Sequence, residues 1–310
     1  MAPRVLVSDE LSETAVQIFR DRGVEVDFQP QLGKDKDKLA EIIGNYDGLA
    51  IRSATKATEK LIAAATNLKV IGRAGIGVDN VDIPAASRRG IIVMNTPFGN
   101  SITTAEHAIA LMFAVARQLP QADVSTQAGK WEKSKFMGVE ITGKMLGVIG
   151  AGNIGGIVCK KAIGLGMHVL AYDPFLSNER AREMGVTKVE LDELLAKADF
   201  ITLHVPMTDK TRGILGRENL AKTKPGVRII NCARGGLVDE QAVVDALNAK
   251  HIAGAAFDVF SEEPAEAAAR AAQDAPPSVY TEWGGGASSD DEYNLEAFVA
   301  AELTLADHLA

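Results

Sequence analysis

The stretch Lys144–Gly155, which reads KMLGVIGAGNIG, constrains the fold more than any other part of the sequence. Its apolar half, Met145–Ile149, has the composition of a buried strand, and a G-x-G-x-x-G motif follows at once. Apolar residues then recur at helical spacing. In such a strand–turn–helix the first glycine permits the turn, the second lets a pyrophosphate approach the backbone, and the third lets helix and strand pack closely. We therefore predict a bound dinucleotide, held by Gly150, Gly152, Asn153, Ile154 and Gly155.

An acidic residue follows the next strand signal. The segment His168–Tyr172 ends at Asp173, about twenty residues past the glycines, where an adenosine ribose lies in such motifs. A carboxylate there accepts hydrogen bonds from both ribose hydroxyls and repels a 2′-phosphate, which predicts NAD rather than NADP as the cofactor. The alternative is a structural glycine turn in an ordinary α/β domain, because Asp173-Pro174 is also a plain turn signal.

The charge and the cysteine content exclude several kinds of partner. The 310 residues carry a net charge of −8, which disfavours nucleic acid as a partner because nothing offsets phosphate repulsion. Cys159 and Cys232 show no C-x-x-C spacing, and we expect neither disulfides nor a metal site. The N-terminus turns acidic too early for a signal peptide and no apolar run approaches a membrane span, so we expect a cytoplasmic protein without membrane contact.

Strand and helix signals alternate along the chain in two series, which predicts two α/β domains, each a doubly wound parallel sheet. Between the series lies an alanine-rich helix, Thr103–Gln118, whose apolar residues need cover on more than one side, from the domains or from a second subunit. A last helix, Glu292–Leu309, is placed to return to the first domain. The predicted strands are Arg4–Asp9, Val24–Phe28, Gly48–Arg52, Lys69–Ala74 and Ile91–Asn95, then Met145–Ile149, His168–Tyr172, Asp199–Pro206, Val227–Asn231, Ala253–Phe260 and Ser278–Glu282.

Polar side chains stand where the strands of the second series end. Ligands of doubly wound sheets bind at the carboxyl ends of the strands, so Gly150, Asp173, Val205, Arg234 and Asp258 should share one crevice. Arg234 can hold a carboxylate with two parallel N–H···O bonds, although a structural salt bridge explains an arginine there equally well.

Three further groups of polar residues bear on the site. Glu263 could orient a catalytic histidine, but a solvated loop acid is the simpler interpretation. At the strand ends of the first series, Arg52 with Ser53 and Arg73 with Gly75 could form an anion pocket, or could be plain surface charge. The five histidines lie at positions typical of satisfied or solvated side chains, and none is predicted to be catalytic: His107, His168, His204, His251 and His308.

Taken together, these residues resemble the D-2-hydroxyacid dehydrogenase family. The matching phrases span Arg4 to Pro264 almost without a gap; they include IRSATK, GRAGIGVDNVD, VMNTPFGNS, AEHAIALM, GKWEKSKFMGVEITGK, ITLHVPMTDKT, NCARGGLVDE and AAFDVFSEEP. The resemblance implies a Rossmann NAD-binding domain (98–286) inserted into a discontinuous flavodoxin-like substrate domain (1–97 and 287–310). It also implies a homodimer that forms through the long helix and its flanks.

The resemblance also implies a reaction and a role for each candidate residue. The reaction is the NAD-dependent oxidation of a small 2-hydroxy acid, with 3-phosphoglycerate, the starting point of serine biosynthesis, as the expected substrate. Arg234 would hold the substrate carboxylate, and Glu263 would pair with a histidine. The motif glycines with Asn153 and Ile154 would hold the pyrophosphate, and Asp173 the ribose. Val205, Cys232, Ala233 and Asp258 would line the nicotinamide half, while Arg52, Ser53, Arg73 and Gly75 would face the substrate.

One departure from the family pattern bears on catalysis. The family places its catalytic histidine in a Pro-His-x-Gly-Ala-Ser phrase, whereas Trp283–Ser288 reads WGGGAS, which puts Gly284 at the histidine position. The alternative function is therefore a catalytically weak NAD-binding sensor or interaction protein. The resemblance further covers only a catalytic core, without the C-terminal regulatory domains that related enzymes often carry.

Overall fold

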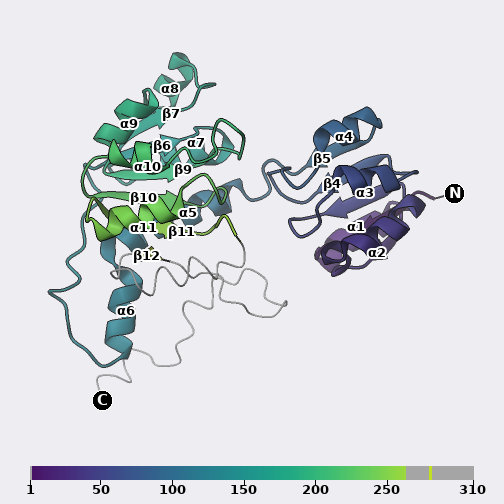
Figure 1. Cartoon of the computed structure of the whole chain (residues 1–310), viewed down its shortest axis with the longest axis horizontal. Helices are drawn as coiled ribbons and strands as arrows, with labels where there is room; N and C mark the ends of the chain where they lie inside the picture. The colour runs from purple at the N-terminus through teal and green to yellow at the C-terminus, as the bar shows by residue number, and fades with distance from the viewer. Residues whose placement is uncertain (1, 263–278, 281–310) are drawn as a thin grey trace.

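The computed structural model describes residues 2–262 and 279–280, which form two lobes, each built on a parallel sheet (Figure 1). The sheet of the first lobe has five strands in the order β2-β1-β3-β4-β5, which is the flavodoxin-like order. Its strands are β1 (Arg4–Val7), β2 (Glu25–Phe28), β3 (Gly48–Ile51), β4 (Val70–Arg73) and β5 (Ile92–Asn95). Its helices are α1 (Glu13–Asp21), α2 (Lys36–Ile42), α3 (Glu59–Ala64) and α4 (Ile83–Arg88), with short 3-10 turns at Leu32–Lys34 and Ile43–Asn45.

Each of these four helices begins where a short polar side chain caps it. Ser12, Asp35, Thr58 and Asp82 each accept a hydrogen bond from the backbone N–H three residues further on. Such a cap satisfies one of the N–H groups that have no partner within the helix, which favours a start at that residue. The capped helices cover the sheet and bury an apolar core that includes Leu6, Leu49, Ile51, Ile62 and Ile71.

The second lobe has a seven-stranded sheet in the order β12-β11-β10-β9-β6-β7-β8, with the Rossmann arrangement at its centre. Its strands are β6 (Met145–Ile149), β7 (His168–Tyr172), β8 (Thr187–Lys188), β9 (Phe200–Leu203), β10 (Val227–Asn231), β11 (Ile252–Phe257) and β12 (Val279–Tyr280). Its helices are α5 (Ser101–Arg117), α6 (Leu119–Gln127), α7 (Asn153–Gly164), α8 (Asn178–Met184), α9 (Leu191–Lys197), α10 (Arg217–Ala221) and α11 (Glu240–Asn248).

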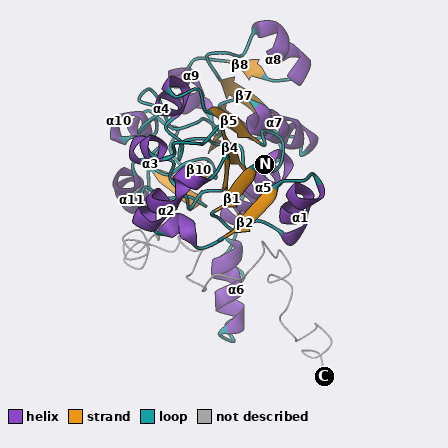
Figure 2. Ribbon diagram, turned by 90° about the vertical axis from the view of Figure 1, so that its right-hand side faces the viewer, coloured by secondary structure: helices purple, strands orange, loops and turns teal. Residues whose placement is uncertain are grey.

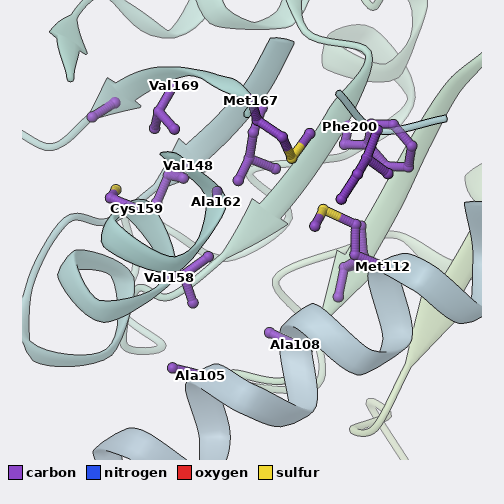
Figure 3. Close-up of a cluster of buried hydrophobic side chains, with 14 of the residues drawn as sticks. Ala105, Ala108, Met112, Val148, Val158, Cys159, Ala162, Met167, Val169 and Phe200 are labelled. Atoms are coloured by element: carbon purple, nitrogen blue, oxygen red, sulfur yellow. The ribbon is translucent and has the colours of Figure 1, made fainter. Parts of the chain in front are cut away.

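Helices cover both faces of this sheet, so its central strands are apolar throughout rather than alternating. On one face α5 and α7 pack against the strands, and Figure 3 shows Ala105, Ala108 and Met112 of α5 in that layer. On the other face α9, α10 and α11 enclose a second cluster that includes Leu194 and Leu220. The predicted fold, two doubly wound parallel sheets, is confirmed.

The long helix is covered by its own lobe. Most of its apolar side chains are buried against α7, β10 and β11, which accounts for the apolar stretch without a second subunit. The chain then breaks at Gln118, which has a left-handed conformation (φ 55°), and continues as α6, which extends away from the lobe (Figure 2). The sequence did not predict α6, α8 or β8, because these short elements bury very few side chains.

The predicted C-terminal helix and the substrate-domain segment 287–310 lie outside the described residues. Among the described residues no helix has the length and apolarity needed to cross a membrane. His251 is half-buried, and its Nε2 lies 3.0 Å from both Thr223 Oγ1 and the carbonyl oxygen of Leu220, as expected for a satisfied side chain.

Candidate active site

The three motif glycines occupy three different environments between β6 and α7. Gly150 has φ 95°, and a Cβ there would lie 2.7 Å from Val205 Cγ1. A Cβ at Gly155 would collide with the carbonyl oxygen of Gly150, so only glycine lets α7 lie this close to the end of β6. A Cβ at Gly152 would meet nothing within 4 Å. The first and third glycines therefore shape the turn, whereas Gly152 faces open space at the start of α7.

The open side of the turn suits a phosphate group. Gly152 is the N-cap of α7 and makes no side-chain cap, so the first N–H groups of the helix are not taken up by a capping side chain. Asn153, the first helical residue, is exposed, and Ile154 is half-buried beside it. Helix N-termini of this kind bind phosphates through their N–H groups and their dipole.

Asp173 lies directly beside the glycine turn. Its Oδ2 accepts a hydrogen bond from the backbone N–H of Ala151 (2.9 Å), and its Oδ1 accepts one from the N–H of Phe175 (2.8 Å). The two bonds fix the carboxylate at the end of β7, and its remaining lone pairs can accept the hydroxyls of a ribose. The open Gly152 and the fixed carboxylate thus fit an adenine dinucleotide without a 2′-phosphate.

The ends of the neighbouring strands line the same edge of the sheet. Val205 follows β9 and packs against the glycine turn, and Ala233, after β10, donates its N–H to Asn231 Oδ1 (3.1 Å). Burial raises the pKa of the Cys232 thiol, and the charge of Asp258 raises it further, so this side chain is a neutral wall. Asp258 Oδ1 lies 3.4 Å from His107 Nε2, which connects the end of β11 with α5.

His204, directly after β9, is half-buried beside the glycine turn. Its Nε2 lies 2.9 Å from Thr202 Oγ1, and burial lowers the pKa of the imidazole to about 4. Its Nδ1 is buried and has no partner among the described residues. The ring is therefore neutral near pH 7, as expected for a packed histidine rather than a general base.

Three arginines from both lobes lie near one another. Arg73 ends β4, Arg52 follows β3, and Arg234 follows β10. Burial lowers the pKa of the Arg73 guanidinium, and the charges of Arg234 and Arg52 lower it further. The Nε of Arg73 is buried without an acceptor among the described residues. An arginine remains charged even so, and these guanidiniums are therefore placed to bind an anion.

Two residues that the sequence analysis missed hold the Arg52 loop. Asp9 is only 2% exposed, and its carboxylate accepts hydrogen bonds from Arg52 N (2.6 Å), Thr55 N (3.1 Å) and Thr55 Oγ1 (2.6 Å). Asn80 Nδ2 donates to the carbonyl oxygens of Arg52 (2.6 Å) and Thr55 (2.7 Å). Ser53 is exposed on the loop that they fix. Two polar residues directly after an apolar strand, Ser8 and Asp9, were the signal that could have identified it.

The loop after β4 contributes a third residue that the sequence analysis missed, Asp79. Its Oδ1 accepts hydrogen bonds from Arg234 Nε (3.0 Å) and Nη2 (2.8 Å), which joins the two lobes. Burial alone would raise the pKa of Asp79, but the hydrogen bond and the charge of Arg234 outweigh it and hold that pKa below its usual value. Gly75, with φ 154°, begins this loop and donates its N–H to Thr96 Oγ1 (2.8 Å).

The structure connects several of the predicted site residues: Val205 packs at Gly150, Asp173 bonds to the glycine turn, and Arg234 reaches Asp79 of the first lobe. The cofactor candidates surround the carboxyl edge of β6, β7, β9, β10 and β11, and Arg234 joins them to the arginines of the first lobe. Glu263 and Gly284 lie outside the described residues, so their predicted roles stay predictions.

Comparisons with known proteins agree with this geometry. The model for the NAD-binding domain of D-isomer-specific 2-hydroxyacid dehydrogenases matches residues 109–282. A D-3-phosphoglycerate dehydrogenase of Archaeoglobus fulgidus is 51% identical over 261 residues, which are 84% of this chain and 49% of that protein. The chain thus spans about half the length of this relative.

Solved structures show the same two-lobed arrangement. A Thermus thermophilus protein superposes with a TM-score of 0.81 at 34% identity, covering 89% of this chain and 87% of that one. A D-lactate dehydrogenase from Aquifex aeolicus, crystallised with NAD and lactic acid, superposes with a TM-score of 0.78 at 26% identity, over 89% and 86% of the two chains. The chain carries the NAD-binding domain of this family, and it belongs to the D-isomer-specific 2-hydroxyacid dehydrogenases.

Proposed function

We propose that the chain oxidises a small anionic D-2-hydroxy acid with NAD and that 3-phosphoglycerate is its substrate. The observation that carries the proposal is the group of three guanidiniums, Arg52, Arg73 and Arg234, which both lobes contribute beside the dinucleotide site. A substrate with a carboxylate at one end and a phosphate at the other offers two anions to this group. The identity to relatives named as 3-phosphoglycerate dehydrogenases supports the same choice of substrate.

Each part of the site has a task in this reaction. The backbone around Gly152 and the start of α7 would hold the pyrophosphate, and Asp173 the adenosine ribose. When bound, NAD would supply the hydride acceptor, and the hydroxyl proton would pass to water. Arg234 would hold the substrate carboxylate, and its positive charge would polarise the carbon–oxygen bond that becomes a carbonyl. Because the Cys232 thiol is neutral, it adds no negative charge of its own to the site.

The test is the rate of NADH formation with 3-phosphoglycerate, D-glycerate and D-lactate. We expect turnover with 3-phosphoglycerate to exceed that with the two acids that lack phosphate. Arg234→Lys should keep NAD affinity and lose most of the turnover, because lysine retains the charge but not the planar pair of donors. Unchanged kcat/KM in this variant would remove Arg234 from the proposed role, and equal rates with all three acids would contradict the choice of substrate.

A second candidate function is an NAD-binding protein with weak catalysis. It is favoured by one feature of the sequence, Gly284 at the position of the family's catalytic histidine. General acid–base catalysis supplies a factor of roughly 10²–10⁴ in rate, so a protein without that group should be slow. In Gly284→His, a large gain in kcat with little change in NAD affinity would support the loss of a catalytic group. If neither the parent nor Gly284→His turns over the substrate, the result would favour the binding function.

We also infer that two chains associate through α6. Large apolar side chains are exposed on this helix and just after it, namely Leu119 (51%), Val124 (67%), Trp131 (82%) and Met137 (79%). Large exposed apolar side chains are typical of a surface that another chain covers.

We further propose that the first lobe binds the substrate and the second lobe binds the cofactor, with boundaries near 98 and 287.

A further inference from the structure

The guanidinium of Arg234 is held along one edge. Its Nε (3.0 Å) and Nη2 (2.8 Å) both donate to Asp79 Oδ1, and its Nη1 donates to the carbonyl oxygen of Ala233 (2.6 Å). A guanidinium has five N–H groups in a rigid plane, and three of them are occupied by these contacts. The two that remain belong to Nη1 and Nη2. They form the other edge of the guanidinium, which can still bind a carboxylate with two parallel bonds.

A glycine makes room for this pair. A Cβ on Gly77 would overlap Arg234 Nη2, and it would lie 2.6 Å from Asp79 Oδ1. The loop between β4 and α4 therefore supplies both the carboxylate and the space that the guanidinium needs. The Asp79–Arg234 pair is therefore a closely packed contact between the lobes, although the side chain of Arg234 is 34% exposed and that of Asp79 is 51% exposed.

The pair also balances charge among the arginines. Arg73 experiences repulsion from Arg234 and Arg52, and Asp79 acts on it in the opposite sense. Asp9 is the other nearby carboxylate, but it is buried and bonded to the Arg52 loop. Asp79 is thus the carboxylate that touches the guanidinium of Arg234, and it does so without a hydrogen bond to Arg73 or Arg52.

We propose that Asp79 is a positioning residue for Arg234: it holds the Nε/Nη2 edge so that the Nη1/Nη2 edge is left for the substrate carboxylate. This inference rests on the proposed role of Arg234 in binding a 2-hydroxy acid. Because the carboxylate and the arginine come from different lobes, the arginine is oriented only while the lobes are in contact. Asp79 itself touches neither substrate nor cofactor.

Two substitutions separate orientation from charge. Both substitutions remove the negative charge of Asp79. Asp79→Asn keeps a carbonyl oxygen that can accept both hydrogen bonds of Arg234, whereas Asp79→Ala removes that acceptor as well. Since misplacing a group by about 1 Å can cost up to ~10²-fold in rate, we expect Asp79→Ala to lower kcat about 10-fold or more. Its KM for the hydroxy acid should stay the same or fall, because the pocket has gained positive charge. Asp79→Asn should keep kcat within about threefold, because its oxygen still orients the guanidinium.

The matched control is Glu59→Ala, which breaks an exposed arginine–carboxylate pair of the same lobe, Glu59 with Arg88, away from the site. It should leave kcat and KM unchanged. NAD affinity should be unchanged in all three variants, because neither carboxylate belongs to the cofactor site. A kcat of Asp79→Ala equal to that of the parent would overturn the proposal. So would a rise in KM without loss of kcat, or equal losses in the alanine and asparagine variants.

A second readout does not depend on turnover. The ¹⁵Nε–¹Hε NMR signal of Arg234, assigned by its loss in Arg234→Lys, should persist in Asp79→Asn and should exchange faster with water in Asp79→Ala. Calorimetry with oxamate in the presence of NADH gives the affinity of the parent and of each variant for a carboxylate. Oxamate is suitable because NADH does not reduce it. If the parent shows no turnover, the proposed function fails, whereas an unchanged Nε–H signal in Asp79→Ala overturns the positioning role by itself.

Discussion

At the scale of single residues, we expect the choice of cofactor to depend on Asp173. Its charge lies beside the glycine turn, bonded to the N–H groups of Ala151 and Phe175. We predict that Asp173→Asn raises affinity for NADP relative to NAD by roughly 10-fold or more, because repulsion of the 2′-phosphate is removed. The asparagine oxygen can still accept one of the two backbone bonds. Fluorescence titration with both reduced cofactors measures the ratio, and an unchanged ratio would show that Asp173 does not face the ribose.

His204 gives the molecule a predictable dependence on pH. Burial holds its pKa at about 4 in the folded chain, compared with 6.5 for a free histidine. Above pH 6.5 the group is neutral in both states and has no effect. Between pH 6.5 and 4 only the unfolded chain takes up the proton, so the free energy of unfolding falls by up to about 1.4 kcal/mol per pH unit. Urea unfolding at pH 7.5 and pH 5 should show a larger loss for the parent than for His204→Gln; equal losses would contradict the prediction.

At the scale of elements, the glycine turn separates folding from cofactor binding. Gly155→Ala should destabilise the second lobe by a few kcal/mol and weaken NAD binding, because its Cβ overlaps the Gly150 carbonyl and forces α7 away from β6. Gly152→Ala has room for its Cβ, so it should unfold like the parent and still lose NAD affinity. Thermal unfolding and NAD titration of both variants test the contrast. Equal stability of the two variants would mean that the turn adapts, and unchanged NAD affinity in Gly152→Ala would place the pyrophosphate elsewhere.

The elements were largely predictable because apolar runs and turn residues mark them in the sequence. β3 is buried at every position and is bounded by polar residues, so the predicted strand differs from it by one residue. By contrast, α8 (NERAREM) buries only Ala181, and such a polar segment carries no periodic signal. The strand ends followed from the parallel topology, which places them all at one edge of the sheet. The Asp79–Arg234 pair joins residues 155 positions apart, and no local pattern encodes how two lobes meet.

At the scale of the whole molecule, α6 and the residues after it are the surface that we expect a second chain to cover. Val124→Asp places a charge in that surface, where association would have to bury it unpaired. We predict that light scattering gives twice the chain mass for the parent and the mass of one chain for the variant. Phe175→Ser, which removes a larger and more exposed apolar side chain (96%) in the second lobe, is the control and should remain dimeric. A parent that is monomeric at micromolar concentration would refute the association.

The division of the site between the lobes has a consequence for how such proteins diversify. The residues expected around NAD all belong to the second lobe. Arg52 and Arg73 belong to the first lobe, where Arg52 begins the loop after β3 and Arg73 ends β4, beside the loop that follows. Mutations in those two loops can therefore exchange one acid for another while the inherited nucleotide module stays intact. Descendants of one ancestor can in this way acquire new substrates and keep the same redox partner.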